Sequence, residues 1–166
     1  FAINTTGTLA IDAVTLTKTD NNVKTLGKGV VSITFDDGLA NTYNNGMPIL
    51  DKNGYKATWY LNASTLNTPS YMNKNQAKRL LAGGQEVGSH SYNHVDLATL
   101  TAAQQQYQVA ANKNALESIL GTPVVHFATP FGSYNSSALS NIMQYNQTHR
   151  DTSGKMNYPY AYDASL

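Results

Sequence analysis

The sequence contains no cysteine, few charged residues and no apolar run long enough to cross a bilayer. The absence of cysteine excludes disulfide bonds, thiolate metal sites and a cysteine nucleophile. Charged residues make up only 13% of the 166 residues, and the formal net charge is +1. We therefore expect neither binding to nucleic acid nor insertion into a membrane.

Apolar and neutral polar residues make up most of the chain instead. The apolar share of 41% predicts one globular domain with a core of its own. The abundant Asn, Thr, Ser, Gln and Tyr suit a sugar-binding surface, because amides and hydroxyls pair with sugar hydroxyls and Tyr rings stack on sugar faces. The chain begins with Phe1 and shows no signal peptide. We interpret it as a mature fragment of a longer precursor and expect an extracellular or cell-envelope location in a bacterium.

Residues 1–17 differ from the rest of the chain and predict a strand, followed by a polar linker over residues 18–28. Apolar side chains alternate in one phase up to Ile11 and in the opposite phase from Val14, as a β-bulge would produce. Residues 7–16 resemble the closing strand of a carbohydrate-binding jelly roll, which would make them the tail of an upstream carbohydrate-binding module. An edge strand packed on the main domain fits the same pattern equally well.

From residue 29 onward the pattern alternates between strands and helices, which indicates a parallel sheet or a (β/α) barrel. The longest helix has a capping box formed by Thr101 and Gln104, and Gly121 as its C-cap. Its expected core-facing side chains are Val109, Leu116, Ile119 and Leu120. The predicted strands are 29–35, 56–61, 85–89 and 124–128, and the predicted helices are 41–52, 73–82, 102–120 and a segment around 139–143.

Three clusters of candidate site residues follow predicted strands, at the carboxyl ends where (β/α) barrels place their active sites. Asp36 and Asp37 follow the first strand, His90 and His94 follow the third, and residues 129–131 follow the fourth. By itself, an Asp-Asp-Gly run is more often a solvated turn than a catalytic pair. The clusters become informative together, because the fold would bring them to one edge of the sheet.

The spacing of His90 and His94, four residues apart, suits one metal ion. On a helical turn the two imidazoles would face the same way, with Cβ atoms about 6 Å apart. Two imidazole nitrogens and one carboxylate leave open positions on a zinc-like ion for water and substrate. Alone the pair is ambiguous, since a buried histidine that bonds a backbone carbonyl is also common.

The clusters together resemble a known family. Residues 32–38, Ser-Ile-Thr-Phe-Asp-Asp-Gly, resemble the first signature of the NodB-like polysaccharide deacetylases, carbohydrate esterase family 4, which includes chitin, peptidoglycan and acetylxylan deacetylases. Residues 84–94, which end in His-Ser-Tyr-Asn-His, resemble the second signature. Residues 54–61 are similar to the strand between the two. The resemblance runs from residue 29 to residue 132 in the right order and spacing.

The resemblance implies a fold, a cofactor and a reaction. The fold would be α/β, a distorted (β/α) barrel of the NodB deacetylase type over residues 29–166, lacking its last strands in this chain. Asp37, His90 and His94 would bind a divalent metal, zinc in the first place, with cobalt or nickel as alternatives. Asp36 would be the general base that takes a proton from the attacking water. The substrate would be an acetylated polysaccharide, with the acetyl group on nitrogen or oxygen.

The segment after the fourth predicted strand would complete this site. In the family, the backbone N–H of the aromatic residue after the motif proline stabilises the oxyanion, and here that residue is Phe131. Pro130, Phe131 and Tyr92 are expected to line the substrate pocket.

The sequence departs from the family pattern in two places. The third signature is Ala128-Thr-Pro-Phe131, whereas relatives have an arginine at its first position, paired with the base carboxylate. Arg150 and Lys155 are candidates to replace that arginine, although we expect Arg150 at the surface. The late Leu-any-His segment that supplies the general acid in relatives is also absent from this chain.

The two remaining histidines are not assigned as that acid. His126 lies within a predicted strand and is expected to be structural, and His149 lies in a polar run and is expected to be exposed. A barrel without its last strands has an open edge, which favours a homo-oligomer or a swapped dimer. Two rival hypotheses stay open: a domain of this family that binds metal or glycan without turnover, and an unrelated α/β domain whose Asp and His clusters are structural.

Overall fold

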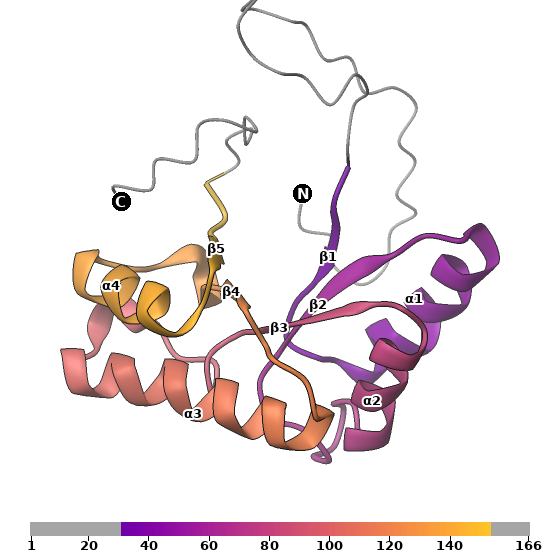
Figure 1. The fold of residues 1–166 in the computed structure, drawn as a ribbon, viewed down its shortest axis with the longest axis horizontal. Coiled ribbons are helices and arrows are strands. Elements are labelled where there is room, and N and C mark those ends of the chain that lie inside the picture. The colour runs from indigo at the N-terminus through magenta and orange to yellow at the C-terminus, as the bar shows by residue number, and fades with distance from the viewer. Residues whose placement is uncertain (1–30, 154–166) are drawn as a thin grey trace, which may run out of the picture. The chain divides into compact units, whose positions relative to one another are not determined.

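The computed structural model describes residues 31–153, of which residues 32–152 fold as one unit (Figure 1). The predicted strand 1–17, the predicted linker 18–28 and Lys155 lie outside the described residues.

Within the described residues, five short parallel strands form one sheet. They pair in the order β1-β2-β3-β4-β5, so each strand lies beside the next one along the chain. The strands are β1 (Ile33–Phe35), β2 (Ala57–Leu61), β3 (Glu86–Ser89), β4 (His126–Ala128) and β5 (Thr148–Arg150).

Four helices connect these strands. In Figure 1 they follow one another around the outside of the sheet, from α1 on the right through α2 and α3 to α4 on the left. The helices are α1 (Ala40–Asn53), α2 (Lys74–Ala82), α3 (Ala102–Leu120) and α4 (Ser136–Tyr145), with the 3₁₀ turns η1 (Leu97–Thr99) and η2 (Pro130–Gly132).

The strand order decides the architecture. In a doubly wound sheet the order reverses at a switch point, and helices cover both faces. Here the order never reverses, and because strand–helix–strand crossovers are right-handed as a rule, successive helices fall on the same face. The sheet therefore curls in one direction into a half-barrel, which confirms the predicted (β/α) barrel class.

On the helix-facing side of the sheet the side chains are apolar and buried. One cluster surrounds Trp59 and includes residues of α1, α2 and α3, and a second surrounds Phe127 and includes residues of α3 and α4. Both aromatic rings are almost completely buried. These two apolar clusters hold the strands in place, and the candidate site residues follow the carboxyl ends of those strands.

On the opposite side, alternate residues of the same strands are polar and form a row across β2 to β5. Thr58 Oγ1 donates to a Glu86 carboxylate oxygen at 2.7 Å, and the other oxygen lies 2.9 Å from His126 Nε2. His126 Nδ1 in turn lies 2.7 Å from Thr148 Oγ1. His126 thus has a partner on each ring nitrogen, as expected of a structural histidine.

Helix α3 is the longest element, and both of its ends are as predicted. Thr101 and Gln104 form the capping box, and Gly121 ends the helix with φ +70°. Ile119 and Leu120 face the core as expected, since both pack against the Trp59 cluster, although they are only partly buried. The fully buried face consists of Gln105, Gln108, Val109, Asn112 and Leu116, three of which carry amide side chains.

Two expectations at the edges of the described sheet are wrong. The first strand is not a buried one, because β1 lies at an edge and its side chains are partly or largely exposed. The strand β5 was not predicted at all, since its three residues, Thr-His-Arg, are polar and show no apolar alternation.

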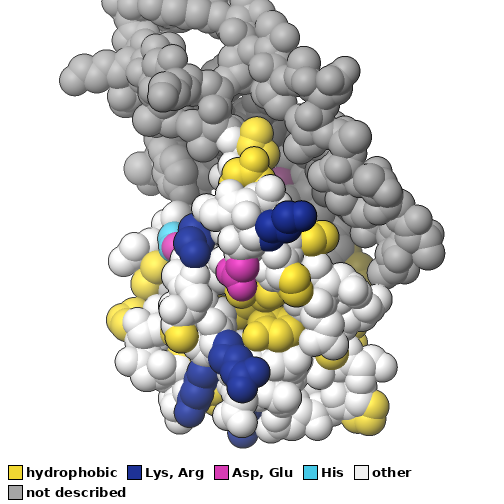
Figure 2. Space-filling model, turned by 90° about the vertical axis from the view of Figure 1, so that its right-hand side faces the viewer, with side chains coloured by type: hydrophobic (Ala, Val, Ile, Leu, Met, Phe, Trp, Pro, Cys, Tyr) yellow, Lys and Arg dark blue, Asp and Glu magenta, His cyan; other side chains and the backbone are white. Residues whose placement is uncertain are grey.

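Figure 2 shows one face of the molecule, on which backbone and side chains that are neither charged nor hydrophobic, drawn in white, cover much of the described surface. Apolar side chains gather near the middle of this face, with a few basic side chains around them. The shortage of charge in the composition is thus visible at the surface. None of the described helices combines the length and apolarity that crossing a membrane requires.

Candidate active site

The chain turns sharply after β1, and this turn separates two adjacent carboxylates. Asp37 and Gly38 both have positive φ, +68° and +73°, and the Gly38 N–H donates to the Asp36 carbonyl oxygen at 2.9 Å. Asp36 continues the direction of the strand, whereas the left-handed backbone of Asp37 turns its side chain elsewhere. Two neighbouring residues can therefore face different partners within one site.

His90 and His94 lie in a loop after β3, so the helical turn considered for them is wrong. Ser91 and His94 have positive φ of +62° and +55°. The Ser91 hydroxyl accepts a hydrogen bond from the His94 N–H at 3.1 Å. A tight non-helical turn, and not helical periodicity, brings the two imidazoles together.

Buried amide side chains hold this histidine loop. Asn62, directly after β2, donates to the carbonyl oxygens of residues 90–91. Gln108 of α3 accepts from the N–H groups of residues 92–93, each at 3.2 Å. Asn112 of α3 bonds the end of β2 and the Ser89 hydroxyl. The loop is therefore positioned by side chains from two other elements.

Sequence reasoning missed Asn62, Gln108 and Asn112. A signal for the helical pair was present, because amides recur at positions 105, 108 and 112, a spacing that places them on one face of α3. That face also carries the buried apolar residues of the helix. An amide within an apolar stripe requires a buried partner, and here two of the partners are the histidine loop and the end of β2.

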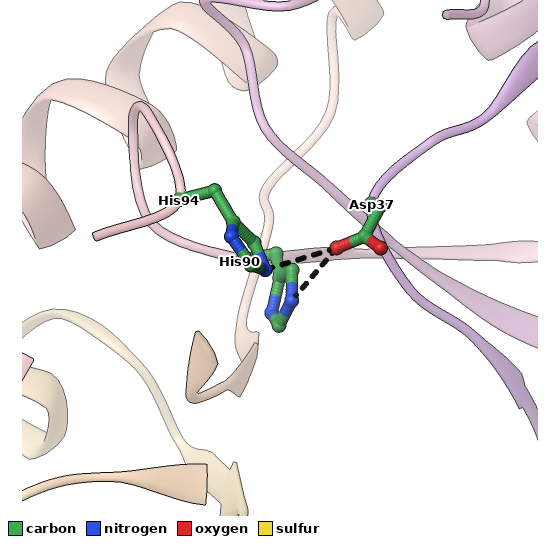
Figure 3. A group of neighbouring side chains, drawn as sticks. All are labelled: Asp37, His90 and His94. Carbon is green, nitrogen blue, oxygen red and sulfur yellow. Dashed lines mark ion pairs between the residues drawn. The ribbon is translucent and has the colours of Figure 1, made fainter. Parts of the chain in front are cut away.

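The three predicted metal-binding side chains converge (Figure 3). The Nε2 atoms of His94 and His90 lie 3.1 and 3.3 Å from Asp37 Oδ1. One candidate ligand atom from each residue lies within 4.8 Å of the other two. The His90 side chain is buried, whereas Asp37 and His94 are partly exposed, so the cluster is reachable from solvent.

The hydrogen bonding of His90 suits a metal ligand. Its Nδ1 lies 2.7 Å from the Ala128 carbonyl oxygen, which can only accept, so Nδ1 carries a proton. Its Nε2 is left facing the Asp37 carboxylate, an arrangement that calls for a second proton or for a cation between them. Apart from these two imidazoles, the buried Asp37 Oδ1 has no partner among the described residues. Ligands of a tetrahedral zinc ion with bonds of roughly 2.1 Å lie roughly 3.4 Å apart, so these residues fit such an ion.

The pKa values of Asp37 and His94 depend on each other. Hydrogen bonding with His90 and then His94 holds the pKa of the Asp37 carboxyl well below its usual range, although burial opposes this. Hydrogen bonding with Asp37 raises the pKa of His94, again against burial. A divalent cation would take over the role of these protons, because metal binding requires neutral imidazoles and an ionised carboxylate.

Asp36 faces Arg150, which corrects the expectation that Arg150 lies at the surface. Arg150 Nη2 lies 2.5 Å from Asp36 Oδ1, and both side chains are about two-thirds buried, with exposed fractions of 29% and 33%. Arg150 is the last residue of β5. Arg150 was one of two candidates for this pairing, but the sequence favoured a surface position because the strand that places it was not predicted.

Phe131 lies beside the cluster, in the turn after β4. Its ring packs edge-on against the His94 imidazole, with 4.7 Å between the centroids, and the residue is 66% exposed. Its backbone has φ +59°, which is rare for an aromatic residue. Within the described residues no hydrogen bond engages its backbone N–H. That N–H is available to a bound group.

The other two predicted pocket residues have clear positions but no tested role. Pro130 is buried at the start of η2, directly before Phe131. Tyr92 belongs to the histidine loop, but its ring packs edge-on against Tyr107 of α3, with 5.9 Å between centroids. Its part in a substrate pocket stays a prediction.

His149 is half-buried, which makes the expectation of an exposed side chain wrong. Its Nε2 lies 2.5 Å from Thr129 Oγ1, and its ring packs against Tyr134 at 4.7 Å between centroids. Burial lowers the pKa of the imidazole below its ordinary value of 6.5. These partners lie around β4 and η2 and give His149 a structural role.

Comparison with known proteins identifies one family. The family model described as polysaccharide deacetylase matches residues 23–149 of this chain. A chitin deacetylase from Pestalotiopsis sp is 37% identical over 111 residues, which cover 67% of this chain and 37% of that protein. The chain thus spans well under half the length of this curated relative.

Solved structures agree with the fold. The deacetylase PplD from Streptococcus pyogenes, in complex with acetate, has a TM-score of 0.69 and 29% identity, covering 72% of this chain and 54% of that one. BA3943 from Bacillus anthracis, a CE4 family pseudoenzyme, has a TM-score of 0.64 and 27% identity, covering 71% of this chain and 41% of that one. The same fold is therefore found in a deacetylase and in a pseudoenzyme.

Proposed function

This chain belongs to the polysaccharide deacetylase family, and from that membership we propose that it is a metal-dependent hydrolase that removes acetyl groups from a polysaccharide. One observation carries the proposal. The ligand atoms of Asp37, His90 and His94 converge at the carboxyl ends of β1 and β3, with the second carboxylate, Asp36, beside them.

Asp37, His90 and His94 would hold a divalent cation, with Zn²⁺ suiting two imidazoles and one carboxylate best and Co²⁺ or Ni²⁺ as alternatives. Such an ion supplies a Lewis acid that polarises the acetyl carbonyl and makes water more acidic. The chain's own contribution is a prearranged ligand set, because the Ala128 carbonyl and the Ser91 hydroxyl hold the two histidines in place.

Asp36 is the candidate general base. Arg150 occupies its Oδ1, which leaves Oδ2 to accept a proton from the attacking water. The carboxylate is held by an ion pair and is therefore oriented before the substrate arrives. A base placed next to the metal ligands needs no large movement to reach a water between itself and the carbonyl carbon.

The Phe131 N–H is the candidate oxyanion donor. The left-handed backbone of Phe131 and the absence of a described partner for its N–H support this role. The exposed ring, packed against His94, would form one wall of the acetyl pocket together with Pro130.

The proposed substrate is an acetylated polysaccharide, with the acetyl group on nitrogen or oxygen. The similarity to a chitin deacetylase supports this class. The surface, poor in charge and rich in neutral polar groups, suits a neutral glycan outside the cell or in the cell envelope.

A second candidate is a domain that binds metal or glycan without turnover. Similarity to a CE4 family pseudoenzyme and the alanine at position 128 favour it. Bound zinc and bound glycan together with no acetate release from any acetylated glycan would support this reading.

Acetate release by the purified protein tests the proposal. We expect zinc- or cobalt-dependent release from chitin oligomers, peptidoglycan or acetylxylan. Asp36→Asn should lower kcat about 10²- to 10⁴-fold while zinc stays bound, since a general base contributes that much. Asp37→Asn should lose the zinc as well, and Asp51→Asn, an exposed carboxylate on α1, is the matched control. If no substrate yields acetate with either metal, the protein is not a deacetylase.

A further inference from the structure

We infer that Arg150 is a positioning residue for the base, and that it performs from β5 the task that the family pattern assigns to an arginine at position 128. The inference rests on the proposed function. Of the two candidates that the sequence offers for this task, Arg150 is the one that the structure describes, and it contacts Asp36.

The first observation is the ion pair itself. Arg150 Nη2 approaches Asp36 Oδ1 to 2.5 Å across 114 residues of sequence. A guanidinium is planar, always charged and presents its donors in a fixed fork, so it fixes the rotamer of the carboxylate that it binds. The bond to Oδ1 selects which of the two Asp36 oxygens can face the reacting water.

The second observation is that the guanidinium is itself held. It lies over the Tyr60 ring, 5.0 Å from the centroid, and Nη1 donates to the Asp151 carbonyl oxygen at 3.3 Å. Tyr60 is buried and lies across Gly88, where an added Cβ would be only 2.5 Å from the ring. The absence of a side chain at Gly88 therefore lets Tyr60 form the platform on which Arg150 rests.

The third observation is the strand register. Ala128, the last residue of β4, pairs with Arg150, the last residue of β5. Residues paired across parallel strands project to the same face of the sheet. An arginine at position 128 and the arginine at position 150 thus start from neighbouring Cα atoms, and either could reach Asp36. Ala128 itself is fully buried and has no side-chain group that could pair with Asp36.

Kinetics distinguish a positioning residue from a simple structural ion pair. A structural pair would affect stability alone. Loss of a positioning residue also lowers the rate of the chemical step without weakening substrate binding, because the residue acts only through the orientation of Asp36.

Kinetics of three variants test the inference. Arg150→Met should lower kcat roughly 10- to 100-fold with KM and zinc affinity changed less than about threefold. Arg150→Lys should recover part of the loss, since the charge returns without the fork. The double variant Ala128→Arg/Arg150→Met should recover at least about tenfold in kcat. Arg79→Met, which removes the other arginine of the chain from an exposed position on α2, is the matched control.

A stability measurement makes the test independent of activity. Arg150→Met should lower Tm by more in the parent than in an Asp36→Asn background, because only the parent loses a charge pair. With Ala128→Arg added to Arg150→Met, the arginine at position 128 should raise Tm. This increase should be larger in the protein with Asp36 than in the Asp36→Asn background.

The outcomes separate the two hypotheses. An active parent whose kcat survives Arg150→Met overturns the positioning role and leaves the proposed function intact. An inactive parent overturns the proposed function, and the stability cycle then decides whether the pair with Asp36 exists. Equal Tm shifts in both backgrounds overturn the inference in either case.

Discussion

His149 lies half-buried between Thr129 and Tyr134, where burial makes protonation of its imidazole unfavourable. Burial is the main reason that its pKa lies below 6.5, the nearby Arg150 acts in the same direction, and Asp151 opposes them. The folded protein therefore disfavours a proton that the unfolded chain accepts near pH 6.5. This single side chain links the stability of the fold to acidity.

We predict that His149 makes the metal-free protein less stable as pH falls from 7.5 to 5.5, and that His149→Gln removes this contribution. The unfolded state binds more protons at that position below pH 6.5, so the free energy of unfolding falls with pH. His94 acts in the opposite direction, because Asp37 raises its pKa. The comparison of variant with parent isolates His149. Denaturant titrations at four pH values check this, and identical pH profiles for both proteins would contradict it.

At the level of elements, α3 connects the core to the histidine loop. Its Asn112 side chain accepts from the Ala63 N–H at 2.6 Å and donates to the Leu61 carbonyl and the Ser89 hydroxyl, each at 2.8 Å. All of these groups lie at the ends of β2 and β3. A single helix face therefore fixes the places from which the loop and its neighbours depart.

We predict that Asn112→Leu lowers the free energy of unfolding by about 2 kcal/mol, because three polar groups lose a buried partner at a position of similar volume. It should also weaken zinc binding, since the end of β2 and β3 would shift. Asn114→Leu, an exposed position on the same helix, is the control and should change neither quantity. Urea denaturation and calorimetric zinc titration provide the two measurements. Unchanged zinc affinity in a folded Asn112→Leu protein would show that the helix does not support the site.

Most elements could be predicted because their signals are local. The capping box at Thr101, the C-cap at Gly121 and the apolar runs of β2 and β3 depend only on nearby residues, and the observed bounds of α3, β2 and β3 differ from the predicted ones by one residue at most. The strand β5 could not be predicted, because its polar residues gain their conformation by pairing with β4. Tertiary pairing overrides weak local preference in such short strands.

The candidate site could also be predicted only in part. Asp37, His90 and His94 were chosen from spacing and resemblance, and the structure brings them together. The means by which it does so, two residues with positive φ in a non-helical loop, leave no periodic trace in the sequence. The Asp36–Arg150 contact depends on strand register across 114 residues, which local patterns do not encode.

For the whole molecule, a bound metal links distant parts of the chain. Asp37 follows β1, His90 and His94 follow β3, and the Ala128 carbonyl that orients His90 belongs to β4. A cation that binds only the folded arrangement stabilises all of it, by about 2.7 kcal/mol when its concentration is 100 times Kd.

We predict that zinc at this excess raises Tm by roughly 5–10 °C and that a chelator reverses the shift. His94→Ala should remove most of the shift, because it deletes one of three ligands. His126→Gln is a matched control, since His126 also lies against a carboxylate, Glu86, but belongs to the polar row on the sheet. Thermal melts of the three proteins with and without zinc check this. A zinc shift that persists in His94→Ala would place the ion elsewhere.

The unreversed strand order also has a consequence for biosynthesis. Each strand pairs with the one before it, so the sheet can grow in the order in which the ribosome releases the chain. All three proposed ligands emerge before β4, which supplies the carbonyl for His90, and β5, which carries the guanidinium for Asp36, comes last. On the proposed assignments, a nascent chain therefore has all three metal ligands before Arg150 is available to orient the Asp36 carboxylate.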